Sequence, residues 1–252
     1  MRLAVDRYNH RLVERKQFKQ EEGQKSTCLT VLIPKERGRL DLENARLLVL
    51  ADFFGYLLQQ KKAKLYAPNF PEIASLAPHL GLILGEGPIS SYDLCLVPRD
   101  YLHLAPTFCF STLRLCGRFF DNSDLNLFLA DYGADALRVF FLYQGPPKKD
   151  FRLDWPALAG AYRFVKKVWE MSYKGGDDRI QGNQNSEGLS ILKKSVESRL
   201  QQQKPHTALA AIMGFLGPRA FLTREETKEI ATLLIPYTPF LSAQLLSVFY
   251  PE

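Results

Sequence analysis

Apolar and polar positions follow two different patterns along the chain, and the change lies near residue 150. Before it, short apolar runs alternate with longer helical segments. Residues 28–33 (CLTVLI) form one such run, which Pro34 ends, and predict a strand buried on both faces. Residues 40–62 are apolar on nearly every side, which predicts a helix packed on more than one face.

Further apolar runs in the first half of the chain are separated by proline and glycine, as strands and loops would be. The segment between residues 69 and 88 leaves room for one short helix, and residues 7–22 have the sparse apolar positions of a surface helix. Strands that alternate with helices predict an α/β fold with a mostly parallel, Rossmann-like sheet. The remaining strands are expected at residues 64–67, 81–84, 92–97 and 107–115.

The second half of the chain shows helical periodicity only. Residues 134–143 predict a helix that the following Gly-Pro-Pro sequence ends, and Asp154 is the expected N-cap of a helix over residues 154–173. Thr223 and Glu226 have the spacing of a capping box. Short loops between such helices predict an antiparallel helical bundle. The other helices are expected at residues 123–130, 189–203, 205–216, 223–235 and 236–249.

The chain is therefore expected to contain two domains, an α/β domain at residues 1–150 and an all-α domain at residues 151–252. Its 252 residues, 46% of them hydrophobic, are enough to bury two modest cores. A net charge of +6 favours anionic partners, with RNA expected rather than DNA.

Cysteine usage and hydropathy indicate a cytoplasmic protein. The four cysteines lie in or beside apolar runs without the spacing of a zinc or thiol-disulfide motif, so buried, reduced thiols are expected. No apolar run is long enough to span a bilayer, and the N-terminus is too charged for a secretory signal. The cysteines are Cys28, Cys95, Cys109 and Cys116.

The loop between the first strand and the first long helix is a candidate phosphate site, because nucleotide-binding folds place phosphates there. Its cations favour that function, whereas Asp41 and Glu43 put negative charge beside the helix N-terminus and favour an acid-capped structural helix. The candidate nucleotide-binding residues are Lys35, Arg37, Gly38 and Arg39.

A basic stripe on the predicted helices is a candidate RNA surface, with a solvated helix face as the alternative. Its residues are Arg163, Lys166, Lys167, Lys193, Lys194 and Arg199.

The middle of the chain resembles a known family. Residues 132–138 (YGADALR), Pro146-Pro147 and residues 160–164 (GAYRF) are similar to the leucyl-tRNA synthetase segment that leaves the class I catalytic fold and enters the anticodon-binding bundle. The similarity extends to residues 8–11 (YNHR) and 206–210 (HTALA).

The leucyl-tRNA synthetase family, which this chain resembles, activates leucine with ATP and transfers it to tRNA. Two signature motifs carry this chemistry. The His-x-Gly-His motif falls here on residues 41–44 (DLEN), so both histidines are replaced. The KMSKS motif falls on residues 114–118 (RLCGR), where glycine replaces the second lysine. Loss of one preorganised charge-stabilising donor commonly costs about a hundred- to a thousandfold in rate. The degenerate positions are Asp41, Glu43, Asn44, Arg114, Gly117 and Arg118.

The resemblance implies a leucyl-tRNA synthetase-like protein that has kept the fold without aminoacylation and acts as a tRNA- or RNA-binding or regulatory module. ATP stays a candidate ligand, although no cofactor is certain. No metal is expected, because residues 87–113 are too few for the family's editing insertion or zinc element, and the family's C-terminal extension is expected to be absent. The alternatives are an ATP-dependent aminoacyl ligase with a rebuilt site and a protein-interaction subunit, as a homodimer or with a partner protein.

Overall fold

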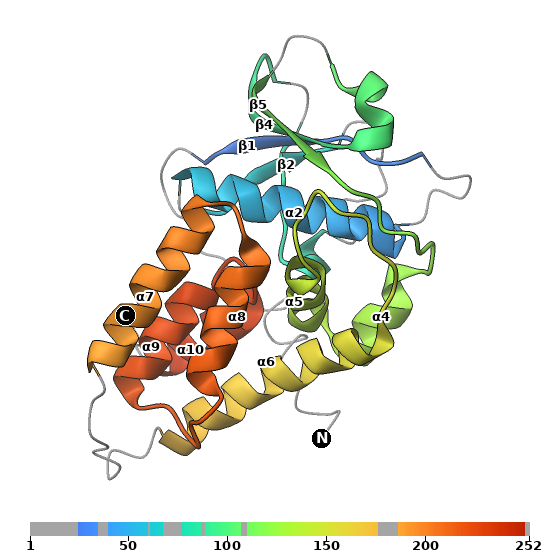
Figure 1. The fold of residues 1–252 in the computed structure, drawn as a ribbon. Coiled ribbons are helices and arrows are strands. Elements are labelled where there is room, and N and C mark those ends of the chain that lie inside the picture. Colours follow the sequence, from blue (N-terminus) through green and yellow to red (C-terminus); the bar gives the residue numbers. More distant parts are fainter. Residues whose placement is uncertain are drawn as a thin grey trace. The chain divides into compact units, whose positions relative to one another are not determined.

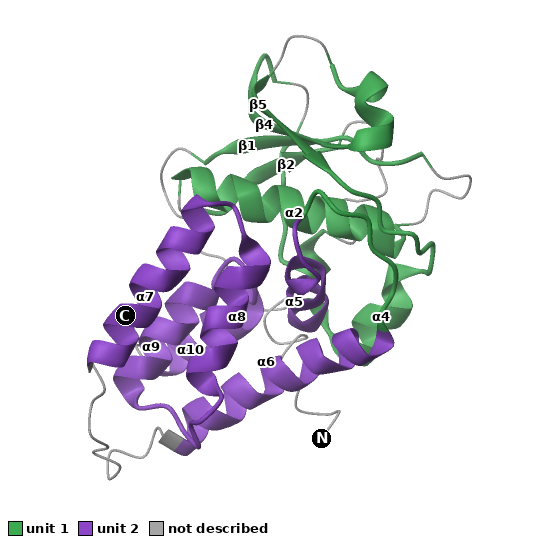
Figure 2. Ribbon diagram, in the orientation of Figure 1, with its two compact units in different colours: residues 1–134, 147–154 green, residues 135–146, 155–252 purple. Residues whose placement is uncertain are grey.

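The computed structural model describes residues 25–34, 40–59, 61–67, 77–86, 89–106, 110–175 and 186–249. The chain forms two compact units: residues 1–134 with 147–154 make unit 1, and residues 135–146 with 155–252 make unit 2 (Figure 2). This division differs from the expected boundary at residue 150, because residues 135–146 group with the helices that follow. The helix expected at residues 7–22 lies outside the described residues.

A five-stranded sheet in the order β3-β2-β1-β4-β5 runs through the described part of unit 1 (Figure 1). All of its neighbouring strands pair in parallel, which confirms the predicted Rossmann-like fold. Strand β1 lies between β2 and β4, so the strand order reverses there, and doubly wound sheets bind ligands at the carboxyl ends of such strands. The strands are β1 (Thr27–Thr30), β2 (Lys64–Tyr66), β3 (Ile83–Leu84), β4 (Tyr92–Pro98) and β5 (Phe110–Cys116).

Helix α2 (Leu42–Gln59) is buried without a break from its first residue to Gly55. The prediction of a helix packed on more than one side is therefore confirmed. Gly55 permits a close approach to the sheet, since an added Cβ would lie 2.5 Å from both Ala63 Cβ and Cys28 Sγ. A separate apolar cluster is formed by residues on β1, β2 and β4 and directly after β1: Leu29, Val31, Tyr66, Tyr92, Cys95 and Val97.

The described cysteines of unit 1 are buried thiols, as expected. Cys28, Cys95 and Cys116 are fully buried and form no disulfide, whereas Cys109 lies outside the described residues. Burial raises the pKa of Cys28 and of Cys116 to about 12. Thiols of this kind are structural rather than reactive.

Short helices complete the described part of unit 1. Helix α4 (Leu125–Tyr132) begins after Asp124, whose carboxylate accepts a hydrogen bond from Asn126 N at 2.9 Å. The 3₁₀ helix η1 (Pro78–Leu80) lies where one short helix was expected. The 3₁₀ helix η2 (Arg99–Leu104), directly after β4, was not predicted.

Unit 2 contains helices and no strand among its described residues, which confirms the predicted all-α half. The capping box is present, with Thr223 Oγ1 accepting from Glu226 N and the Glu226 carboxylate accepting from Thr223 N. No helix among the described residues is long and apolar enough to cross a membrane. The helices are α5 (Ala134–Tyr143), α6 (Trp155–Gly175), α7 (Ser186–Gln201), α8 (Pro205–Leu216), α9 (Arg224–Leu234) and α10 (Pro239–Phe249).

Two buried charges of α5 hold the start of α10. The Asp135 carboxylate accepts hydrogen bonds from Phe240 N at 3.3 Å and Leu241 N at 2.7 Å, so it caps a helix more than a hundred residues away. The fully buried Arg138 donates to Pro236 O at 2.7 Å. Both residues belong to the YGADALR stretch, which therefore has a structural role in unit 2.

Candidate functional site

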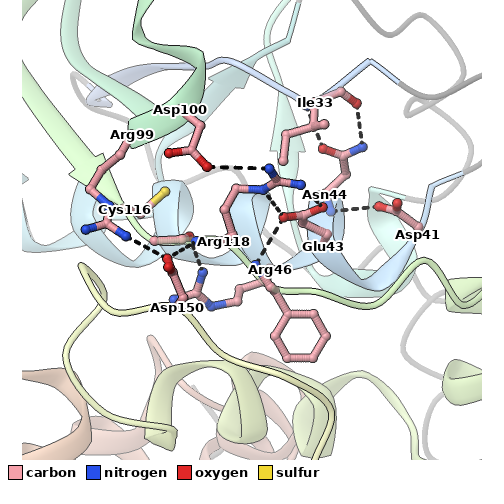
Figure 3. A network of polar contacts seen from close by, with 12 residues as sticks. Ile33, Asp41, Glu43, Asn44, Arg46, Arg99, Asp100, Cys116, Arg118 and Asp150 are labelled. Carbon is pink, nitrogen blue, oxygen red and sulfur yellow. Dashed lines mark hydrogen bonds and ion pairs between the residues drawn. The ribbon is translucent and has the colours of Figure 1, made fainter.

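The candidate site of unit 1 lies at the carboxyl ends of β1 and β4, where α2 begins. The Asn44 side chain binds the backbone leaving β1, with Oδ1 accepting from Ile33 N at 2.9 Å and Nδ2 donating to Ile33 O at 3.0 Å (Figure 3). Asp41 Oδ1 accepts from Asn44 N at 2.8 Å. Asp41 and Asn44, two of the degenerate signature residues, thus make their hydrogen bonds within the chain at the N-terminus of α2.

The third of these residues, Glu43, pairs with Arg118 across 75 residues of sequence. Arg118 Nε lies 2.5 Å from Glu43 Oε1, and Arg118 Nη2 lies 3.1 Å from Oε2 (Figure 3). Glu43 Oε1 also accepts from Phe119 N at 3.1 Å. The side chains are 2% and 18% exposed, respectively, so this bidentate pair is largely withdrawn from water. A salt bridge therefore joins one residue of each degenerate signature, Glu43 and Arg118.

Arg118 is engaged on several further sides. Asp100 Oδ2 lies 3.6 Å from its Nη1, and the guanidinium carbon lies 5.2 Å from the Tyr101 ring centre and 5.3 Å from that of Phe120. The hydrogen bond to Glu43, followed by nearby negative charge, raises the pKa of Arg118 despite its partial burial. The cation is thus already neutralised inside unit 1.

Residues 147–151, which we call the strap, pass along the segment after β5. Gly117 N donates to Pro147 O, Phe151 N to Arg118 O and Phe120 N to Phe151 O, each at 2.9 Å. Asp150 Oδ1 accepts from Arg118 N at 2.9 Å and from Arg99 Nη2 at 2.8 Å. The backbone hydrogen bond from Arg118 leads the causes that lower the pKa of Asp150.

Arg46 on α2 binds the strap and the end of β5 through hydrogen bonds. Its Nη1 donates to Gly117 O at 2.9 Å and its Nη2 to Pro147 O at 3.3 Å, while the guanidinium carbon lies 5.2 Å from the centre of the Phe151 ring. Only 1% of Arg46 is exposed, and burial lowers its pKa. Sequence reasoning missed Arg46, because a charged residue in a long helix is usually solvent-exposed.

Gly117 is required for the close approach of the strap. A Cβ on Gly117 would lie far inside contact distance of the Lys149 carbonyl carbon and oxygen, which are backbone atoms. We therefore expect Gly117→Ala to lower the free energy of unfolding by about 1–3 kcal/mol, measured by thermal unfolding. Gly214→Ala is the matched control, since nothing lies within 4 Å of its added Cβ. Equal effects of the two substitutions would contradict this role of Gly117.

The two signature arginines are not brought together. Arg114 lies on β5 with its guanidinium carbon 4.7 Å from the centre of the Phe54 ring, and burial lowers its pKa. Phe54 is 11 residues after Glu43 on α2, about 16 Å along the helix. Arg114 and Arg118 therefore do not form one phosphate site. The candidate nucleotide-binding residues Lys35, Arg37, Gly38 and Arg39 lie outside the described residues.

The predicted basic stripe of unit 2 is partly neutralised. Lys193 Nζ lies 2.8 Å from Glu229, and Lys166 Nζ lies 3.6 Å from Glu170. Lys167 Nζ donates to Gly217 O at 3.3 Å, and Arg199 Nη1 to Ser195 O at 3.0 Å. Exposed members are Arg163, Lys167 and Lys194.

A hollow of about 370 Å³ beside α7 and α9 contains more acids than bases. Lys193 and Lys194 line it together with three glutamates, so its charge sums to −1. Such a hollow does not favour a phosphate group. Among the described residues, no three His, Cys, Asp or Glu side chains converge as metal ligands. The acids of the hollow are Glu197, Glu225 and Glu229.

Comparisons with known proteins give one consistent relationship. No protein-family model matches the chain. It is 31% identical over 140 residues to a leucine–tRNA ligase of Coxiella burnetii, a match that covers 45% of this chain and 17% of the relative. A leucine–tRNA ligase of Desulfatibacillum aliphaticivorans is 28% identical over 150 residues, covering 48% and 17%. The match thus spans less than a fifth of these relatives.

The fold has a counterpart among solved structures. The LeuRS in the ternary complex LeuRS–tRNA–LeuAMS of Agrobacterium radiobacter K84 agrees with a TM-score of 0.51 and 14% identity, over 64% of this chain and 28% of that one. The likeness to this solved structure supports the assignment of the fold. The sequence matches support the relationship to leucine–tRNA ligases. The chain is therefore a leucyl-tRNA synthetase-like protein with a class I synthetase fold.

Proposed function

We propose that the chain is an RNA-binding protein, with tRNA as its expected partner, and that it does not form an aminoacyl adenylate. The Glu43–Arg118 salt bridge carries this proposal, because it joins the two signature positions to each other and leaves neither for a nucleotide.

Among the described residues, charge at the carboxyl edge of the sheet argues against triphosphate binding. Four acids and three arginines lie in this network, so the sum of their formal charges is −1. ATP would bring further negative charge and would have to separate a pair of which one partner is almost fully buried. The degenerate motifs also lack the histidine donors on which transition-state stabilisation in the family depends. The residues are Asp41, Glu43, Asp100 and Asp150 with Arg46, Arg99 and Arg118.

RNA binding has separate support. The chain carries a net charge of +6, its relatives are named leucine–tRNA ligases, and the solved LeuRS of the same fold is a complex with tRNA. Neutralising phosphates with lysine and arginine gives salt-sensitive affinity without sequence selectivity. The proposed activity therefore needs exposed cations and no nucleotide chemistry.

The test combines two assays on the full chain. In ATP–pyrophosphate exchange, we expect no leucine-dependent signal. In fluorescence anisotropy with a labelled tRNA transcript, we expect binding at low salt, and the logarithm of the affinity should fall linearly as the logarithm of the salt concentration rises. Exchange with any amino acid would replace the proposal by a ligase with a rebuilt site. Absence of tRNA binding at low salt would remove RNA as the partner and favour a protein-interaction subunit.

A further inference from the structure

We propose that the strap and its neighbours form a contact surface for single-stranded RNA. We call it the strap surface, and it combines exposed cations with one exposed aromatic ring. This inference rests on the proposed function, because it names where RNA would be bound. Its residues are Arg99, Phe120, Lys148, Lys149 and Arg152.

The strap surface is held by a fixed backbone. Three backbone hydrogen bonds of 2.9 Å and the Arg46 contacts to Gly117 O and Pro147 O fasten the strap to the end of β5 and to α2. A charged surface on a fixed backbone loses less conformational entropy on binding than one on a free loop. The strap is therefore preorganised to present its side chains.

The cations of the strap surface outnumber its acids. Residues 147–152 (PKKDFR) hold three cations and one acid, a sum of +2. The acid, Asp150, already accepts from Arg99 and Arg118 N, whereas Lys148 and Lys149 are exposed and have no ion-pair partner among the described residues. Four residue steps from Lys148 to Arg152 span at most about 14 Å, so the three cations can meet neighbouring phosphates of one strand.

Phe120 adds a surface on which a base can stack. The residue is 51% exposed, and its N donates to Phe151 O at 2.9 Å, which places it beside the strap. The Arg118 guanidinium carbon lies 5.3 Å from the ring centre and restrains the ring. Cations that follow the backbone together with an aromatic stacking surface are the usual elements of single-strand binding.

The basic stripe of unit 2 is the competing surface. Lys193 is paired with Glu229, and Lys194 shares its hollow with three glutamates. The strap surface has no comparable excess of acid among residues 147–152. The observations therefore favour the strap.

The strap surface is tested with Lys148→Ala/Lys149→Ala in the full chain, using a labelled oligouridine of about 12 nucleotides. Two lost phosphate contacts should weaken binding about two- to thirtyfold. They should also reduce the slope of log affinity against log salt by about 1.4. Lys25→Ala/Lys64→Ala removes the same charge where β1 and β2 begin, at the opposite edge of the sheet, and should leave the slope unchanged.

Phe120→Leu separates stacking from charge. It should weaken oligouridine binding about fivefold or more with an unchanged salt slope, because no cation is lost. If the wild type binds oligouridine and both strap variants bind it with the same affinity, the strap surface is not the RNA contact, and the proposed function stands. Loss of binding in Lys193→Ala/Lys194→Ala alone would assign the contact to unit 2. Strap-dependent binding to phosphatidylserine vesicles but not to oligouridine would replace RNA by a membrane surface. If the wild type binds neither oligouridine nor tRNA, the proposed function itself fails.

Discussion

Glu43→Ala is expected to destabilise unit 1 by about 2–4 kcal/mol. The substitution leaves the Arg118 guanidinium without its bidentate partner and Phe119 N without its acceptor, in a place where the lost carboxylate was 2% exposed. Breaking a buried pair by removing one partner commonly costs about 3–5 kcal/mol. The lower range applies here because Arg118 is 18% exposed and keeps Asp100 nearby.

The measurement must report on unit 1 alone. Both tryptophans, Trp155 and Trp169, lie on α6 in unit 2, so intrinsic fluorescence follows the wrong unit. Native-state hydrogen exchange, read by mass spectrometry on peptides of α2 and β5, gives the local opening free energy directly. Both peptides should exchange faster in Glu43→Ala.

Two variants show whether the pair itself carries the effect. Asp100→Ala removes a 3.6 Å contact of a 59% exposed carboxylate and should cost less than about 1 kcal/mol. In a double-mutant cycle of Glu43→Ala with Arg118→Ala, the combined loss should fall short of the sum by about 0.5–3 kcal/mol. Strict additivity would mean that the two side chains do not interact in solution.

The sequence patterns predicted most of the fold because local physics determines it. The Thr223–Glu226 capping box depends on residues within one helical turn, and it was expected. The distribution of apolar residues over nearly every side of α2 likewise predicted its burial. Helix η2 was missed, because its six residues (RDYLHL) have no side-chain cap and no sustained periodicity.

The site was only partly predictable, because its contacts join residues distant in sequence. Glu43 was expected to repel phosphate, but its partner Arg118 lies 75 residues away. One signal was available: the two degenerate motifs carry opposite charges, with acids at residues 41 and 43 and arginines at residues 114 and 118. Gly117 was interpreted as a lost lysine, whereas in the structure it makes room for the strap backbone.

Asp135→Ala is expected to destabilise unit 2 by about 2–4 kcal/mol. The carboxylate accepts from two first-turn amides of α10, Phe240 N and Leu241 N, and Asp135 is 3% exposed. The substitution therefore removes a helix cap and leaves buried donors without an acceptor, costs of about 1 and about 1–3 kcal/mol. Here tryptophan fluorescence during urea unfolding is the appropriate measurement, since α6 carries both tryptophans.

The effect of Asp135→Ala on stability is expected to be large because the Asp135 carboxylate is buried. Asp124 caps α4 by accepting from Asn126 N in an exposed setting, so Asp124→Ala should cost only about 0.5–1 kcal/mol. Because α4 belongs to unit 1, this control is measured by native-state hydrogen exchange on α4 peptides. Asp135→Asn keeps an acceptor without the charge and should fall between wild type and alanine. If Asp135→Ala costs no more than Asp124→Ala, the long-range cap does not hold unit 2 together. If it costs the expected amount, the YGADALR resemblance reflects the assembly of a helical unit, which a chain without adenylation still needs.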